Sequence, residues 1–248
     1  MTAATGVAEA LQQLTEVADW MRWWLRAPTD ALADGELACA TLAASPQDLA
    51  HAVETGADAR GTDDPVVLAS LWWQGYAYRV GGTALACWLL TGVAPDVRAE
   101  GMAVGVARGR PSSVAYASGE GTDDVGTLSD WLFAGHLDRV AESLGAKRRL
   151  GSGLVWGNVA AACAAGAGAV REAAGPGWHD GLAAFLAIAP HDLDGLGAWE
   201  PLPGWAYHRR TCCLWWKTTT SAGALCSDCS LHRAATEQPT RPDDPVSQ

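Results

Sequence analysis

The chain has 248 residues, of which 49% are hydrophobic, and a formal net charge of -11. This length suits one large domain or two small ones, and the apolar fraction supports a core that needs no disulfides. The acidic balance excludes non-specific nucleic-acid binding, which requires a basic surface. Because no basic stretch followed by an apolar run stands behind Met1, we expect no signal peptide and a reducing, cytoplasmic environment.

The first helices are marked by periodicity and by capping signals. Apolar side chains at helical spacing predict a helix over residues 4–26, which Pro28 ends. A second helix start is predicted where Ser45 as N-cap precedes Pro46 at the first helical position. Both signals indicate a helical N-terminal part.

The same capping signal recurs at Asp64 and Pro65. The apolar stretch behind it predicts a helix to about residue 80, a break at Gly81 and Gly82, and a second helix over residues 83–90. We therefore expect two consecutive helices here.

Further along, short β-prone runs flank a Gly/Arg/Pro/Ser turn and predict a β-hairpin with strands near 102–107 and 112–117. Glycine and aspartate then predict a loop up to residue 126, and the segment from 190 to 203 is also expected to be a loop. Three more helices are expected, over residues 127–145, 154–170 and 178–188.

Residues 151–170 carry no charge and are long enough to span a membrane. They are mostly glycine and alanine and include Asn158, so we interpret them as a buried helix. The predicted fold class is mainly α (α+β), a helical domain with a small β-hairpin or sheet. The expected parts are a helical domain (1–204), a C-terminal metal-binding segment packed on it (205–233) and a disordered tail (234–248).

The stretch "TCCLWWKTTTSAGALCSDCSL", residues 211–231, holds four of the seven cysteines: Cys212, Cys213, Cys226 and Cys229. Disulfides are disfavoured in a reducing compartment. A structural zinc site is usually built from two Cys-x₂₋₄-Cys knuckles, and only the second pair has that spacing. A [2Fe–2S] cluster spreads four thiolates over two irons, which suits an adjacent pair better. Zinc remains the alternative.

The cysteine segment is a basic island on an acidic protein. Residues 205–233 have a net charge of +3, which leaves -14 for the remainder. Three roles are open for its basic residues Arg209, Arg210 and Lys217. They could raise the reduction potential of a cluster, dock a redox partner, or be ordinary solvated side chains. Trp215 and Trp216 lie between the cysteine pairs and are candidates for shielding a cluster from water or for contacting a ligand.

The stretch "RRTCCLWWKTTTSAGALCSDCSLHR" resembles the C-terminal iron–sulfur segment of the FhuF-type siderophore-iron reductases. Weaker similarity extends upstream, through "LASLWWQGYAYRVGGTALACWLLTGVAPD" and "GLVWGNVAAACAAGA". The family pattern has ten residues between the cysteine pairs, and this chain has twelve, which we interpret as a loop insertion.

The resemblance implies a cytoplasmic [2Fe–2S] protein whose cluster ligands are Cys212, Cys213, Cys226 and Cys229. It implies one-electron reduction of the ferric ion in a hydroxamate-type siderophore complex. The expected partners are a ferric siderophore and an electron donor of the ferredoxin or flavin reductase type, with no nucleic acid. The resemblance is compatible with a peripheral position at the cytoplasmic face of the membrane. A non-catalytic electron carrier and a zinc-stabilised helical binding module are the alternatives.

Overall fold

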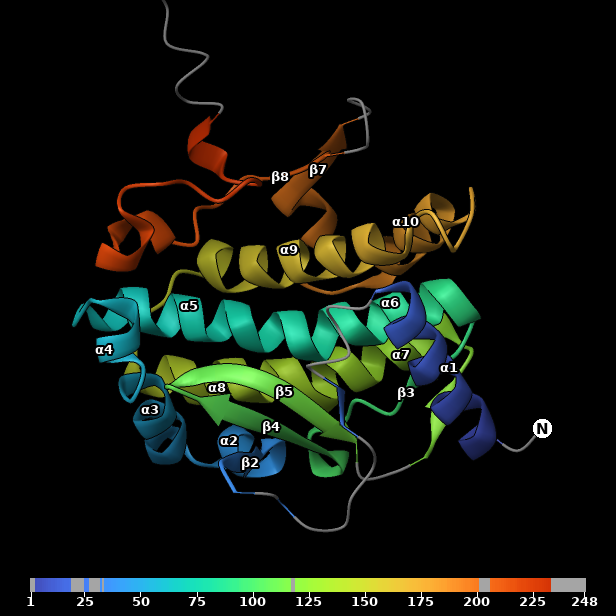
Figure 1. The fold of residues 1–248 in the computed structure, drawn as a ribbon, viewed down its shortest axis with the longest axis horizontal. Helices are drawn as coiled ribbons and strands as arrows, with labels where there is room; N and C mark the ends of the chain where they lie inside the picture. The colour runs from blue at the N-terminus through green and yellow to red at the C-terminus, as the bar shows by residue number, and fades with distance from the viewer. Residues whose placement is uncertain are drawn as a thin grey trace, which may run out of the picture.

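The computed structural model describes residues 3–18, 25–26, 32, 34–116, 119–200 and 206–232 (Figure 1). Within these ranges the chain is mostly helical with small sheets, so the predicted mainly α fold of the α+β class is confirmed. The predicted disordered tail, residues 234–248, lies outside the described residues.

The α-helices are α1 (Ala3–Val17), α2 (Cys39–Ala44), α3 (Pro46–Glu54), α4 (Ala57–Arg60), α5 (Pro65–Ala77), α6 (Thr83–Thr91), α7 (Val125–Leu132), α8 (Asp138–Lys147), α9 (Ser152–Val170) and α10 (Trp178–Ile188). The structure also has two π-helical turns, η2 (Tyr78–Gly82) and η4 (Phe133–Leu137), and four 3₁₀ turns, η3 (Ala99–Gly101), η5 (Leu193–Leu196), η6 (Trp215–Lys217) and η7 (Thr219–Ser221). The strands are β1 (Leu25–Arg26), β2 (Glu36–Ala38), β3 (Ala94–Pro95), β4 (Met102–Ala107), β5 (Arg110–Tyr116), β6 (Gly121–Thr122), β7 (Gly197–Glu200) and β8 (Ala206–Arg209).

Both helix starts that were predicted from capping signals are confirmed. The Ser45 hydroxyl accepts the backbone N–H of Asp48 at 3.2 Å, and α3 opens with Pro46. The Asp64 carboxylate accepts the backbone N–H of Val66 at 2.9 Å at the start of α5. These caps satisfy backbone donors that have no partner within the helix.

The predicted break at Gly81 and Gly82 is wrong. Helix α5, the π turn η2 and α6 form one continuous helical rod, and α9 packs along it (Figure 1). A Cβ on Gly82 would lie 2.8 Å from the Ala162 carbonyl oxygen of α9. The glycines therefore let two helix backbones approach closely, and the wider π turn keeps the rod continuous.

The predicted hairpin is confirmed as antiparallel β4 and β5, with Val104 opposite Val114. Its two-residue turn places Arg108 at φ 51° and Gly109 at φ 64°, the left-handed pair of a type I′ turn. Strand β2 pairs antiparallel with β4, and β1 pairs parallel with β5, giving the order β1-β5-β4-β2. The sheet is thus larger than a hairpin.

The helix predicted over residues 4–26 is wrong at its C-terminal end. Helix α1 ends at Val17, and Leu25–Arg26 form strand β1 beside Val114 and Ala115. The apolar spacing up to residue 25 fits a helix, but pairing with a strand that is distant in sequence determines the conformation of its last residues.

The remaining helices match prediction with small shifts. Helix α7 begins at Val125 because Asp124 accepts the Thr127 N–H at 2.7 Å, and the helical run continues to Lys147 instead of stopping at Gly145. Helix α10 has the predicted bounds, 178–188.

Two segments that were predicted as loops contain strands. In the first, β6 pairs with β3, opposing Thr122 to Ala94. In the second, β7 pairs with β8, opposing Trp199 to Tyr207, so the proposed boundary at 204/205 lies between two paired strands. Both pairings involve only two to four residues per strand, which is too short for a clear alternation of apolar residues.

Helix α9 is the centre of the apolar core, and Val159, Ala162, Cys163 and Ala167 are fully buried along it. It is the one helix in the described part of the chain that is long and apolar enough to cross a membrane, and 72% of its apolar window is buried inside the fold. That burial is consistent with the core helix of a soluble protein.

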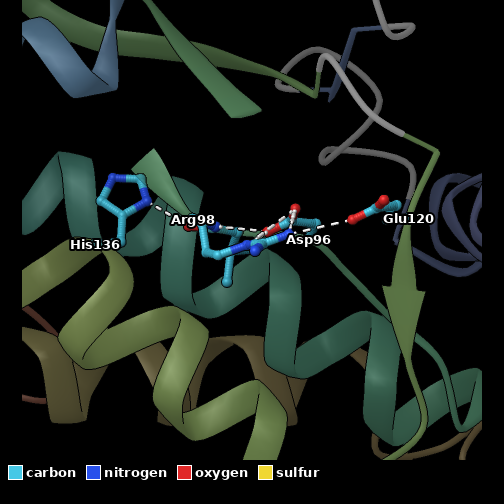
Figure 2. A network of polar contacts seen from close by, with 5 residues as sticks. Asp96, Arg98, Glu120 and His136 are labelled. Carbon is cyan, nitrogen blue, oxygen red and sulfur yellow. Dashed lines mark hydrogen bonds and ion pairs between the residues drawn. The ribbon is translucent and has the colours of Figure 1, made fainter. Parts of the chain in front are cut away.

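A polar network fastens the segment between β3 and η3 (Figure 2). The Arg98 guanidinium donates to Asp96 at 2.7 Å and to Glu120 at 3.1 Å. His136, from η4, contacts the Val97 carbonyl oxygen through Nδ1 at 2.5 Å. These bonds hold the chain against β6 and η4 as it leaves the rod.

Candidate functional site

The cysteine segment lies over the N-terminal halves of α9 and α5, at the end of the molecule that also carries α4 (Figure 1). Strand β8 leads into the Cys212–Cys213 pair, and the turns η6 and η7 form half of the twelve-residue spacer before Cys226. Cys213 and Cys229 are each 1% exposed, whereas Cys212 and Cys226 are half-buried. The structure therefore places one cysteine of each pair in the protein interior.

Two of the four sulfurs are close enough to share one metal ion. The Sγ atoms of Cys213 and Cys226 lie 3.6 Å apart. Thiolates at ~2.3 Å from a tetrahedral metal are about 3.8 Å apart, so this distance fits two ligands of one ion. In the described part of the chain, no group of three or more His, Cys, Asp or Glu side chains converges as a metal site. The four cysteines and the distance between Cys213 and Cys226 fit a metal bound by thiolates, but the four sulfurs do not converge on one point.

The Cys212 sulfur accepts a hydrogen bond from the Leu214 backbone N–H at 3.3 Å. Leu214 has a φ of 70°, an uncommon backbone conformation for a branched residue. This turn directs a backbone N–H toward the Cys212 sulfur, and N–H donors to sulfur are among the interactions that tune iron–sulfur centres.

The paired thiols differ in acidity from the isolated ones. A hydrogen bond from the Cys226 thiol lowers the pKa of Cys213 to about 6, and the nearby Arg209 charge adds to this effect against the opposing effect of burial. The same hydrogen bond raises the pKa of Cys226. For the three cysteines outside the segment, burial raises the thiol pKa to about 12: Cys39, Cys87 and Cys163. Burial also raises the pKa of Cys212, so a lowered thiol pKa is confined to Cys213 among these cysteines.

A buried chain of polar contacts ties the two cysteine pairs to the helices. Arg209 donates through Nε to the Asp228 carboxylate at 2.8 Å and through Nη1 to Asn158 Oδ1 at 3.0 Å. Asn158 Nδ2 lies 3.2 Å from the Ser70 hydroxyl oxygen, which itself donates to the Cys213 carbonyl at 2.9 Å. We call Asp228, Arg209, Asn158 and Ser70 the anchoring chain. It connects the Cys-x₂-Cys turn, α9, α5 and the Cys-Cys pair.

Arg209 therefore has a role that its sequence context did not reveal. Its side chain is fully buried, and its Nη2 lies 2.7 Å from the Asp228 carboxylate. Burial alone would lower the pKa of Arg209, but Asp228 and other nearby groups raise it above the ordinary value. The charge of Arg209 is compensated by a carboxylate and is not available as a free surface cation.

The other predicted basic and aromatic residues lie nearer the surface. Arg210 donates to the Gly195 carbonyl at 2.9 Å, and the Lys217 ammonium lies 5.8 Å from the centre of the Trp216 ring. Trp216 is 42% exposed. Trp215 packs beside the small apolar cluster around Cys213. Trp215 is thus placed to exclude water, and Trp216 faces solvent.

The spacer is docked on α4 and not free in solvent. The Thr219 N–H donates to the Gly61 carbonyl at 3.3 Å, and the Thr220 hydroxyl donates to the Arg60 carbonyl at 3.3 Å. Gly61 adopts φ 61°, and a Cβ there would overlap the Thr219 side chain. The insertion in the spacer thus falls in a part of the chain that contacts the helical body.

Sequence reasoning missed Ser70, Asp228 and Arg60 as residues of this site. Asn158 was a partial signal, because it is a polar residue within an otherwise apolar stretch. Asp228 was a second partial signal, because its carboxylate lies in the sequence between two potential thiolates, Cys226 and Cys229. Burial also raises the pKa of Tyr78 to about 12, with the Asp228 charge adding to the shift. No local sequence motif indicates that Tyr78 lies near the anchoring chain.

A family model described as "Ferric iron reductase FhuF-like transporter" matches residues 70–191. The matched range includes Ser70 and Asn158 of the anchoring chain and ends before the cysteine segment. No curated protein is similar enough to the chain to count as a match.

Proposed function

Because residues 70–191 place this chain in the FhuF-like ferric iron reductase family, we propose that it is a [2Fe–2S] ferric-siderophore reductase. The family match supports a reductase that acts on ferric iron. The observation that supports the cluster is the Cys213–Cys226 pair, with sulfurs 3.6 Å apart, anchored to the matched helical body. Cys212, Cys213, Cys226 and Cys229 would hold the cluster.

The cluster, when bound, supplies one electron that converts Fe³⁺ in the chelate to Fe²⁺ as the cluster itself is oxidised by one electron. Hard oxygen donors, such as those of a hydroxamate-type siderophore, hold Fe³⁺ far more tightly than Fe²⁺. Reduction alone therefore makes the ion releasable, and no acid–base machinery is required. The chain's part is to hold the thiolates, exclude water with Trp215 and bring the chelate near the sulfurs.

We further propose a cytoplasmic location, peripheral at the membrane face, with a ferredoxin or flavin reductase as electron donor. Two features support a rigid attachment of the cysteine segment to the helical body. The twelve-residue spacer contacts α4, and the anchoring chain is buried between the segment and the helices. A rigid attachment keeps the electron path short and fixed.

Purified protein tests the proposal directly. Anaerobic preparation should give about two irons per chain and visible absorbance, as a [2Fe–2S] centre requires. Cys226→Ser should remove or alter this absorbance. Cys163→Ser is the matched control, since its thiol is fully buried in α9 and should leave the absorbance intact. A colourless protein holding one zinc would contradict the cluster and favour the zinc-stabilised binding module.

Turnover needs its own assay. After anaerobic photoreduction, adding a ferric hydroxamate chelate should reoxidise the protein and release Fe²⁺ to a ferrous chelator in equal amounts. If no ferric chelate reoxidised the reduced cluster, the protein would be an electron carrier and not a ferric-siderophore reductase.

A further inference from the structure

Three half-buried arginines gather at the end of the molecule that carries the cysteine segment. They are Arg60 from α4, Arg79 from η2 and Arg110 at the start of β5. Arg60 donates to the Leu71 carbonyl at 3.2 Å, and Arg79 donates to the Gly75 carbonyl at 2.9 Å on the same face of α5. Arg110 donates to the Ala59 carbonyl. We call this set the arginine cluster.

The arginine cluster holds like charges close together. Burial lowers the pKa of Arg60 to about 10, and repulsion from Arg110 contributes. Burial and the Arg60 charge together lower the pKa of Arg79 to about 10. Among the described residues, no carboxylate forms an ion pair with Arg60 or Arg110. Partly buried cations without carboxylate partners are costly for the fold and typical of anion-binding sites.

A surface hollow of about 520 Å³ opens beside Arg110. It is lined by Arg108, Arg110 and one carboxylate, Asp58, together with Thr55, Ala59 and Ala107. The Arg110 Nε is buried and has no hydrogen-bond partner in the described structure. The volume lies within the range of small-molecule sites, and guanidinium groups such as those of Arg108 and Arg110, which both line the hollow, bind carboxylates through charge-assisted hydrogen bonds.

The arginine cluster is also connected to the cysteines. The Arg60 carbonyl accepts the Thr220 hydroxyl of the spacer, and the Leu71 carbonyl that Arg60 contacts belongs to a residue that packs against Cys213. Ala59, the neighbour of Arg60, lines the hollow, so a molecule held there would lie close to the spacer of the cysteine segment. This position suits a substrate that receives an electron there.

We propose that the hollow beside Arg110 binds a carboxylate-bearing, negatively charged ferric chelate, and that the arginines lining it, Arg108 and Arg110, select it over neutral chelates. The proposal rests on the proposed function and specifies its substrate class. The whole chain has a net charge of -11, which repels an anion in general, so a local basic site is needed to admit one. A neutral hydroxamate chelate gains nothing from these guanidinium groups.

The test compares binding of two probes to the purified, cluster-loaded chain by quenching of its tryptophan fluorescence. Ferric EDTA is the negatively charged, carboxylate-bearing probe, and ferric tris(acetohydroxamate) is the neutral one. Arg108→Gln and Arg110→Gln, which replace the two arginines that line the hollow, should each weaken ferric EDTA binding about tenfold, the usual loss for a charge-assisted hydrogen bond. Both should leave binding of the neutral probe within about twofold. Raising the salt concentration should weaken only ferric EDTA binding.

Arg149→Gln is the matched control, because Arg149 is exposed and outside the arginine cluster. Unchanged visible absorbance in each variant confirms that the cysteine segment is intact. Equal binding of ferric EDTA to the wild type and both arginine variants, or equal losses for both probes, would overturn the proposal. Reoxidation of the photoreduced protein by the neutral probe is a separate measurement, so failure of the proposed function would be seen independently of the arginine variants.

Discussion

At the scale of single residues, His136 shows how burial sets protonation. Its Nδ1 contacts the Val97 carbonyl oxygen, so that nitrogen carries the proton and Nε2 accepts from the Tyr76 hydroxyl at 2.5 Å. Burial lowers the pKa of His136 to about 4. The imidazole is therefore a neutral member of a satisfied hydrogen-bond network in the core, not a metal ligand.

Because His136 is buried in its neutral form, we predict that the protein loses stability in mild acid. Its pKa of about 4 in the folded state lies below that of an unfolded histidine, ~6.5, so the unfolded chain takes up a proton first as pH falls. Stability from this group is full above about pH 6.5 and is lost progressively toward pH 4, by about 2 kcal/mol between pH 7 and 5. Urea unfolding at the two pH values, followed by circular dichroism, measures it.

His136→Gln provides the comparison, because glutamine does not titrate. The variant should be less stable at pH 7 but should lose about 2 kcal/mol less than the wild type on going to pH 5. The same pH dependence in both proteins would show that folding does not lower the pKa of His136, against the burial and contacts that the structure gives it.

At the scale of elements, the helical rod and α9 pack backbone against backbone. A Cβ on Gly166 would lie 2.8 Å from the Gly82 carbonyl carbon, and the nearest atoms on both sides are backbone. Backbone cannot rotate away as a flexible side chain can, so an added methyl group must push the two helices apart.

Gly166→Ala should therefore destabilise the protein by roughly 1–3 kcal/mol, although alanine is the better helix former. Gly145→Ala is the matched control, because Gly145 is an exposed residue of α8 and a Cβ there meets nothing within 4 Å. That change should be neutral or stabilising by up to about 1 kcal/mol. Thermal unfolding of the two variants gives the comparison, and a Gly166→Ala protein as stable as Gly145→Ala would contradict the close packing.

The elements that were predicted correctly are those whose sequence signals involve only neighbouring residues. The caps at Ser45 and Asp64 were correct because a cap involves only three or four neighbouring residues. The break at Gly81 and Gly82 was wrong because the role of these glycines depends on α9, which is far away in sequence. Strand β1 was missed for the same reason, since its only partner in the described sheet is β5.

The candidate site follows the same rule. The four cysteines were predicted as ligands from their spacing, and this stays a prediction. The approach of Cys213 to Cys226 was not predicted, because it depends on the path of the spacer over α4. Arg209 was predicted to raise a cluster potential, to dock a redox partner or to be a solvated side chain, whereas its partners Asp228 and Asn158 remove it from solvent. The arginine cluster joins residues from three elements and has no sequence signature.

At the scale of the whole molecule, the anchoring chain makes the cysteine segment and the helical body interdependent. The Arg209 side chain is fully buried, and the Asp228 carboxylate compensates its charge. Removing one member of a buried ion pair leaves an uncompensated charge in the interior and costs about 3–5 kcal/mol, whereas removing both members costs much less. The attachment of the segment should therefore depend on the pair and not on either residue alone.

Asp228→Asn should loosen the segment, so that it becomes accessible to protease and its visible absorbance decays faster than in the wild type. Adding Arg209→Met to this variant removes the stranded charge and should restore much of the lost stability. Glu142→Gln, an exposed carboxylate on α8, controls for the loss of one negative charge. Limited proteolysis and the half-life of the absorbance report on the segment, and circular dichroism reports on the helices. If the double variant were less stable than Asp228→Asn by the full cost of a second mutation, the pair would not act as a unit, and the segment would be held by its other contacts with α4 and α5.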